Sequence, residues 1–429
     1  MFERFIVQFS DNLGALRDFV DLIAPFLAEK HSEEIKEDAI NLAPIFVLGL
    51  NRLDPEMFEL DDHVKSRVTK HFGEISISEN LGPEETSITI DFPDSEHEKN
   101  LERALKRLSR SYKRKGFLYQ SSLISLVSFA EWFLSQLLHQ HFDRFPDMIG
   151  THDKAFSLND LKLIGSIDDA RNQIIESEVE GILRGSFSDW LVFLKSQLKL
   201  SMSYLSSEKD QITEVFQRRN VLIHNAGILN AIYMANVPEE LRTGLTKGMS
   251  IRVTKSYLND AICLFEKYFI LIAAELWKQY DPKEQSRGEV LNKIAHEHLR
   301  QERWSIAESL SYFVMNDKQL PEIRQLLGKI NYWQSLKWQG RFDEVRPEIE
   351  KIDFSAKDEL FEAFRFALLD QEENFFPLSD NLVKIGKLTT SNLEEWPIFR
   401  EIRKTTIYTQ KYSEGIQAAL TIEKVDEQP

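Results

Sequence analysis

Residues 216–227 read Phe216-Gln217-Arg218-Arg219-Asn220-Val221-Leu222-Ile223-His224-Asn225-Ala226-Gly227. On an ideal α-helix, residues four apart lie within about 40° of one another around the axis. Asn220 and His224 therefore share one face, whereas Arg219, five residues before His224, points about 140° away from it. The pattern predicts a helix whose apolar residues 221–223 form the buried side and whose polar residues point outward.

These residue types suit the cleavage of RNA without a metal ion. A neutral imidazole such as His224 can take the proton from a ribose 2′-hydroxyl. The Arg219 guanidinium can hold the scissile phosphate and stabilise its growing charge, and the Asn220 amide can orient either group. The attack is internal to the RNA, so the expected product is a 2′,3′-cyclic phosphate. The alternative is a solvated helix face with a hydrogen-bonded histidine.

The segment resembles the signature of the HEPN (higher eukaryotes and prokaryotes nucleotide-binding) ribonucleases. That signature is an arginine, a polar residue directly after it, and a histidine after a gap of four to six residues. Arg219, Asn220 and His224 fill these places with a four-residue gap, and Asn225 and Gly227 extend the likeness. The resemblance covers residues 98–282. It implies a helical bundle with a long early helix and with the motif late in the domain.

The resemblance also implies how such a protein works. Arg219, Asn220 and His224 would be catalytic, with Arg218 and Asn225 in support. The active centre usually forms at a two-fold interface in this family, which implies a homodimer through the HEPN domain, using helices 121–142 and 211–234. The implied function is a metal-independent endoribonuclease without cofactors, acting as a toxin or antiviral defence effector. Some family members are inactive, so a scaffold that binds protein or nucleotide remains an alternative.

A second feature is a run of basic residues on the predicted helix 101–115. Helical spacing places most of them along one stripe, and they are Arg103, Lys106, Arg107, Arg110, Lys113 and Arg114. The stripe predicts contacts with RNA phosphates. It can also be a solvated face, or it can dock on the acidic residues 1–98, which would then inhibit the enzyme internally. Glu131, in an apolar helix, needs a partner and can orient Arg218 or Arg219 or face solvent.

Composition limits the remaining possibilities. The net charge of −16 is concentrated at the start, because residues 1–98 hold 22 of the 69 acidic residues but only eight of the 53 basic ones. The rest of the chain is therefore nearly neutral and can present a basic surface. A single cysteine excludes a disulfide framework within the chain. No signal peptide is recognisable, and apolar runs such as 43–50 are too short to span a bilayer, so we expect a cytoplasmic protein.

The low content of Gly and Pro predicts an all-α protein in three parts. An acidic region, residues 1–97, should contain helices 5–30 and 33–50 and a small β-hairpin on either side of residues 80–83. The HEPN domain, residues 98–282, should begin with separate helices 101–115 and 121–142. Residues 287–429 should form tetratricopeptide-like helical repeats that bind a protein or ligand trigger. Four related turns support the repeats, with their aromatics at Trp304, Phe342, Phe375 and Tyr412.

Overall fold

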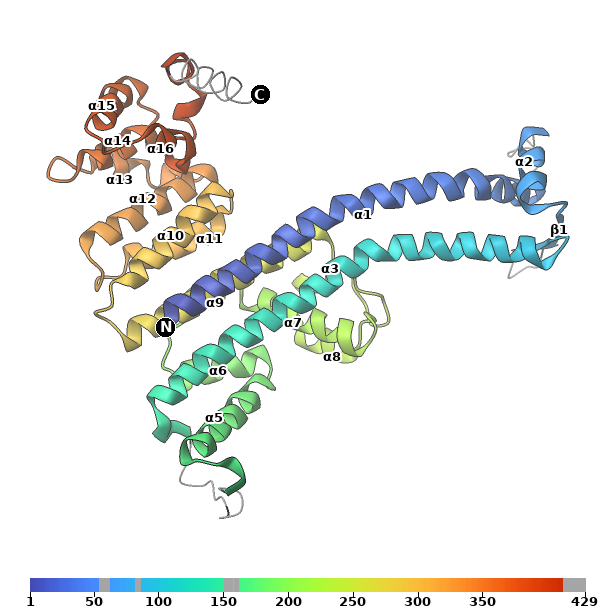
Figure 1. Ribbon diagram of the computed structural model, residues 1–429, viewed down its shortest axis with the longest axis horizontal. Helices are drawn as coiled ribbons and strands as arrows, with labels where there is room; N and C mark the ends of the chain where they lie inside the picture. The colour runs from blue at the N-terminus through green and yellow to red at the C-terminus, as the bar shows by residue number, and fades with distance from the viewer. Residues whose placement is uncertain (54–61, 82–85, 150–156, 158–161, 412–429) are drawn as a thin grey trace, which may run out of the picture. The chain divides into compact units, whose positions relative to one another are not determined.

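Figure 1 shows the computed structural model, which describes residues 1–53, 62–81, 86–149, 157 and 162–411. Within these ranges the fold is all-α apart from one hairpin, as the sequence predicts. The chain divides into two compact units. Unit 1 comprises Met1–Asp11, Phe129–Thr213 and Asp260–Pro429, of which residues 412–429 lie outside the description. Unit 2 comprises Asn12–Ser128 and Glu214–Asn259.

Unit 2 contains most of two long helices, α1 (Phe2–Leu53) and α3 (Ser95–Arg144). Within this unit the two helices lie side by side and antiparallel (Figure 1), and His31 Nδ1 is 2.6 Å from Ser111 Oγ. Helix α1 is continuous where the sequence predicted the two helices 5–30 and 33–50, and α3 is continuous where it predicted 101–115 and 121–142. The predicted break in α3 falls at Gly116, where glycine costs a helix only about 1 kcal/mol relative to alanine. Packing against α1 is therefore enough to keep α3 continuous across this residue.

The chain between these helices forms α2 (Asp62–Phe72) and the predicted β-hairpin. Strands β1 (Ser76–Leu81) and β2 (Thr86–Asp91) pair antiparallel, with Ser76 opposite Asp91 and Leu81 opposite Thr86. The turn at 82–85 lies outside the described residues. Because α3 begins at Ser95, it runs through residue 97, where the sequence suggested a domain boundary.

Unit 1 has a core of aromatic side chains from distant parts of the chain. The Phe9 ring of α1 stacks on Phe133 of α3 with 4.4 Å between ring centroids, and Phe2 stacks on Trp277 at 5.9 Å. Trp277 belongs to α9, a helix whose apolar residues are buried almost throughout its length. The first residues of the chain therefore pack together with the end of α3 and with α9, although they belong to the acidic N-terminal region.

The shorter elements complete both units. The helices between α3 and the repeats are α5 (Ile167–Leu183), α6 (Phe187–Ser196), α7 (Lys209–His224), α8 (Ala231–Asn236) and α9 (Lys255–Tyr280). Short 3-10 turns occur at Pro146–Ile149, Ser203–Leu205, Glu239–Arg242, Phe342–Glu344, Pro397–Phe399 and Ile402–Lys404.

The C-terminal part of unit 1 is built from helix pairs, as the repeat pattern predicts. The helices are α10 (Ser286–Arg300), α11 (Trp304–Met315), α12 (Glu322–Trp338), α13 (Arg346–Lys351), α14 (Glu359–Leu368), α15 (Glu372–Lys384) and α16 (Thr390–Glu395). The first helix of each of three pairs ends in the same turn, with left-handed backbone at Glu302, Gly340 and Asp370. In each turn the next N–H donates to the carbonyl five residues earlier, the bond that defines a Schellman helix end. The fourth predicted turn differs, because its described residues 409–411 are helical.

Glycine allows α12 to approach α11 closely within the repeats. A Cβ atom on Gly328 would lie 2.9 Å from Val314 Cγ1 and 3.1 Å from the Met315 backbone nitrogen. We expect Gly328→Ala to destabilise the protein by about 1–3 kcal/mol through overpacking, measured as a lower midpoint of thermal unfolding. The matched control is Gly181→Ala in α5, where no atom lies within 4 Å of the new methyl group. That change should raise stability by about 0.5–1 kcal/mol. Equal midpoints for the two variants would contradict the packing argument.

One helix in the described part of the chain meets the length and composition of a membrane span. It is the Leu101–Arg144 part of α3, and half of its most apolar window is buried inside the protein. The sequence alone did not point to this segment, because Ser, Gln and Glu131 interrupt its apolar run. A buried core helix passes the same test, so the structure does not clearly mark a membrane protein.

Candidate functional site

The HEPN-like motif lies at the C-terminal end of α7. One face of this helix is buried through Ile212, Val215, Phe216 and Val221, each no more than 6% exposed. Arg218 follows Val215 by three residues and precedes Val221 by three, so it lies on the same face. The helix therefore carries an arginine into the interior of the protein.

Arg218 is held by a carboxylate, a carbonyl and an aromatic ring. Its Nε donates to Glu214 Oε1 at 2.8 Å, and its Nη1 donates to the Arg252 carbonyl at 2.6 Å. The guanidinium carbon lies 3.9 Å from the centroid of the Tyr257 ring. Burial lowers the pKa of Arg218, but Tyr257 and Glu214 raise it overall, so the side chain keeps its charge. Arg218 thus braces α7 from inside and is only 9% exposed.

Glu214 is the common partner in a buried network, called here the brace, that also contains Arg218, Tyr233 and Tyr257. Besides Arg218 it accepts hydrogen bonds from the hydroxyl groups of Tyr233, at 2.7 Å, and of Tyr257. Burial and the Glu214 carboxylate raise the pKa of both tyrosines, so both hydroxyl groups stay protonated and can donate. The network ties α7 to α8 and to the beginning of α9, and it fixes the helix that carries the motif.

The three proposed catalytic residues lie on the less buried side of α7. Arg219 and Asn220 are half-buried, and His224, the last residue of the helix, is exposed. His224 forms no hydrogen bond or ion pair with any residue that the structure describes. Its ring is therefore open to a ligand from solvent, which a general base for RNA cleavage requires.

The expectation that residues 221–223 form one buried side was wrong for its last member. Val221 is 3% exposed and Leu222 is half-buried, but Ile223 is 47% exposed. The reason is helical geometry, because Ile223 follows Arg219 by four residues and Asn220 by three and so shares their face. An apolar side chain therefore stands in solvent beside the proposed catalytic group.

A tight turn follows the motif and is closed by Asn225. The N–H groups of Asn225 and Gly227 both donate to the Val221 carbonyl, at 3.0 and 3.1 Å, and Ala226 and Gly227 have positive φ. The Asn225 side chain donates to the Ile228 carbonyl. Asn225 thus shapes the end of the helix through its side-chain amide.

The turn rests on a small core of its own. Val221, Leu229, Tyr233, Val237 and Ile251 are buried together, and the segment after the turn pairs with residues 249–251 through backbone hydrogen bonds. The position of His224 is thus set by packing and hydrogen bonds on both sides of the helix end.

Exposed apolar side chains occur on the elements around His224. Besides Ile223 they are Ile228 at 39%, Ile232 at 64% and Met249 at 44% exposure. They come from the turn, from α8 and from the segment paired with the turn. Exposed apolar side chains bind another protein chain where they form one contiguous patch.

The basic residues of α3 remain largely at the surface. Arg103, Lys106, Arg107, Arg110 and Lys113 are exposed, and Lys106 pairs with Glu102 at 3.6 Å. Arg114 is half-buried and forms an ion pair with Glu34 of α1. The predicted docking on the acidic region therefore occurs at Arg114. Glu131 is half-buried on α3.

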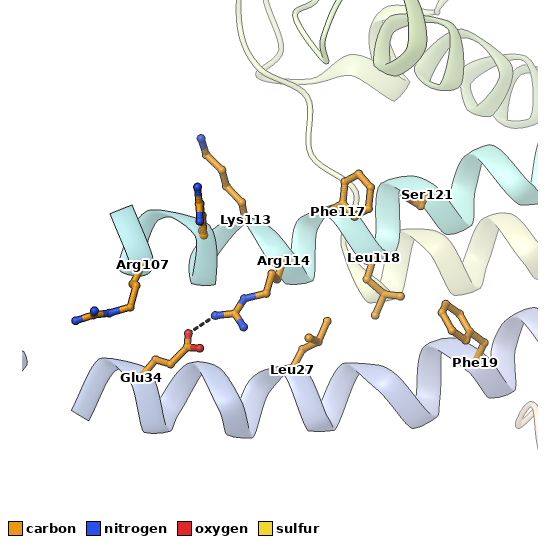
Figure 2. A pocket seen from close by; sticks show the side chains of 10 residues that line it. Phe19, Leu27, Glu34, Arg107, Lys113, Arg114, Phe117, Leu118 and Ser121 are labelled. Carbon is orange, nitrogen blue, oxygen red and sulfur yellow. Dashed lines mark hydrogen bonds and ion pairs between the residues drawn. The ribbon is translucent and has the colours of Figure 1, made fainter. Parts of the chain in front are cut away.

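A groove of about 800 Å³ lies between α1 and α3 in unit 2. Figure 2 shows Leu27, Leu118 and the Arg114–Glu34 pair between the two helices. The described residues that line it are Phe19, Leu27 and Glu34 from α1, with Arg107, Arg110, Lys113, Arg114, Phe117, Leu118 and Ser121 from α3. The sequence pointed to the arginines and lysines, but the apolar part of the groove was missed because it needs both helices.

No protein-family model matches this sequence, and comparison with curated proteins and with solved structures finds no similar chain. Within the described ranges, no group of three or more His, Cys, Asp or Glu side chains could hold a metal ion. What the chain does must therefore be inferred from its own side chains.

Proposed function

We propose that this chain is a metal-independent endoribonuclease of the HEPN kind. The observation that carries the proposal is the exposure of His224 at a firmly held helix end, with Asn220 one turn earlier on the same face. A base must reach its proton within hydrogen-bonding distance, and an exposed imidazole permits this. The buried brace around Arg218 supports the proposal because it holds the helix from its inner side while His224 stays exposed.

The reaction needs only groups that the motif offers. His224 takes the proton of a ribose 2′-hydroxyl, and the 2′-oxygen attacks the adjacent phosphorus. The bond from phosphorus to the 5′-oxygen breaks, and that oxygen takes a proton from solvent. The products are a 2′,3′-cyclic phosphate and a 5′-hydroxyl group. Arg219 stabilises the negative charge on the phosphoryl oxygens during the attack.

We propose further that the active form is a homodimer. Arg219 and His224 lie about 140° apart around α7, so one helix directs them to different sides. Two copies related by a two-fold axis can bring the arginine of one to the histidine of the other. The exposed Ile223, Ile228, Ile232 and Met249 offer an apolar surface for such a contact.

The biological role that fits such an enzyme is cleavage of cytoplasmic RNA as a toxin or antiviral defence effector. The helix pairs after α9 would bind the protein or ligand that triggers it. An inactive scaffold is the second candidate, and the stacked helix pairs favour it because helical repeats commonly form binding surfaces.

The test is cleavage of RNA by the purified full-length protein in the presence of EDTA. We expect cleavage to persist without divalent metal and to leave 2′,3′-cyclic phosphate ends, identified by mass spectrometry of the products. The same RNA with 2′-O-methyl groups at every position should resist cleavage, because the nucleophile is blocked. Cleavage that stops in EDTA and returns with Mg²⁺, or cleavage of the methylated RNA, contradicts the mechanism. No cleavage of any RNA favours the scaffold.

A further inference from the structure

The groove between α1 and α3 combines cations with exposed aromatic rings. Along α3, Arg107, Arg110, Arg114, Phe117 and Ser121 recur at alternating spacings of three and four, so they form one stripe. The stripe runs beside the buried contact line of Ser111 and Leu118, each one residue later. From Arg107 to Arg114 it covers about 10 Å of helix.

The charge of the groove favours an anion. Among the described residues that line it are the cationic side chains of Arg107, Arg110, Lys113 and Arg114 and one carboxylate, that of Glu34. That carboxylate already pairs with Arg114. Arg110 and Lys113 form no ion pair with any residue in the described part of the chain. The positive charges of Arg110 and Lys113 are thus available to phosphate groups.

The apolar part of the groove favours a flat ring as well. Phe117 is 70% exposed and Phe19 is 52% exposed, although both are large apolar side chains. In Figure 2, Leu27, Leu118 and Phe19 lie between the two helices, and Phe117 projects from the side of α3 that faces away from α1. Aromatic side chains next to basic ones are the usual arrangement for binding single-stranded nucleic acid, where bases stack and phosphates pair with cations.

We propose that this groove binds unpaired nucleotides of the RNA, with a base against Phe117 and the neighbouring phosphates on the α3 cations. The proposal rests on the proposed ribonuclease function and places a second RNA contact in the same compact unit as the motif. The cations of the groove follow one another along α3 from Arg107 to Arg114, which suits a strand better than a single nucleotide.

Two other occupants fit the surface less well. A duplex hides the faces of its bases, so it could use the cations but not Phe117. An anionic membrane would meet α1 as well as α3, and the exposed Asp18 lies directly before Phe19 there. Its carboxylate would repel the lipid headgroups, whereas a strand lying along α3 avoids it.

The test measures RNA binding by the full-length His224→Ala protein, so that cleavage plays no part in the readout. The probe is a fluorescently labelled 12-nucleotide oligouridylate, alone or annealed to its complement, observed by fluorescence anisotropy. Adding Phe117→Ala should weaken binding of the single strand at least about five-fold, the lower end for loss of one stacked base. Phe117→Trp should retain the affinity. The affinity for the duplex should be the same whether residue 117 is phenylalanine or is replaced by alanine.

Matched controls separate the groove from its surroundings. Phe26→Ala removes a phenyl group that is 61% exposed on α1 and does not line the groove, and it should leave binding unchanged. Unchanged affinity of Phe117→Ala, or an equal loss in Phe26→Ala, would overturn the proposal. Binding to phosphatidylserine vesicles that depends on Phe117 while RNA binding does not would overturn it in favour of a membrane. Failure of the wild-type protein to cleave RNA tests the motif alone and leaves this binding result intact.

Discussion

Replacing His224 with alanine should slow RNA cleavage by about 10²–10⁴-fold, the usual contribution of a positioned general base. The side chain is exposed and has no partner among the described residues, so its loss should leave thermal unfolding unchanged. The measurement is the initial rate of cleavage of a labelled RNA, with the unfolding midpoint determined on the same sample. His139→Ala, which changes a histidine of α3 in unit 1, is the control and should cleave normally. An unaltered rate in His224→Ala removes the proposed mechanism.

Arg219→Ala offers a sharper version of the same experiment. Alone it should lower the rate by about 10²–10³-fold, the cost of removing one group that stabilises transition-state charge. Mixing equal amounts of Arg219→Ala and His224→Ala protein should then restore about a quarter of the activity if the site is shared across a two-fold axis. Half of the randomly formed dimers are mixed, and each mixed dimer has one complete site. No recovery after subunit exchange would mean that each chain forms its site alone.

Glu214→Ala should destabilise the protein by about 3–5 kcal/mol, because it leaves the buried Arg218 cation without its carboxylate. The two tyrosine hydroxyl groups would lose their acceptor at the same time. The effect should be seen as a lower midpoint of thermal unfolding and as faster amide hydrogen exchange in residues 214–237. Glu180→Ala is the matched control, since Glu180 pairs with Arg184 at the same four-residue spacing on an exposed surface. It should cost about 0.5 kcal/mol or less.

A double variant distinguishes charge from packing in this brace. Replacing both Glu214 and Arg218 with leucine removes the buried charges together, and such exchanges are often neutral or stabilising. The double variant should therefore be more stable than Glu214→Ala. If it is as unstable as the single variant, the brace acts through its hydrogen bonds to Tyr233, Tyr257 and the Arg252 carbonyl and not through paired charge.

The sequence predicted the local elements of the fold well and its long-range packing poorly. Alternation of apolar and polar residues identified both strands of the hairpin, and recurring turns identified the helix pairs. Helix ends were less reliable, because Gly116 suggested a break that the packing of α3 overrides. Helix α3 runs through residue 97, where the sequence suggested a domain boundary. Phe2 and Phe9 from before that residue fill a core with Trp277 and Phe133, and no local pattern reveals these contacts.

The sequence likewise predicted the local features of the candidate site and missed its long-range contacts. The spacing within α7 correctly indicated that Asn220 and His224 share a face, and the position of Glu214 four residues before Arg218 was an available signal for their ion pair. The other partners of Arg218 come from residues 252 and 257, so its burial could not be read from the motif. The groove was hidden for the same reason, since Phe19 and Phe117 are almost a hundred residues apart.

The repeated turn inside each helix pair has a consequence for how such a chain can change over time. The same backbone geometry ends α10, α12 and α14, so a duplicated pair would carry its internal turn with it. Each pair packs mainly on its neighbours in arrays of this kind, so stability changes step by step with their number. The number of helix pairs can therefore change separately from the helix that carries His224.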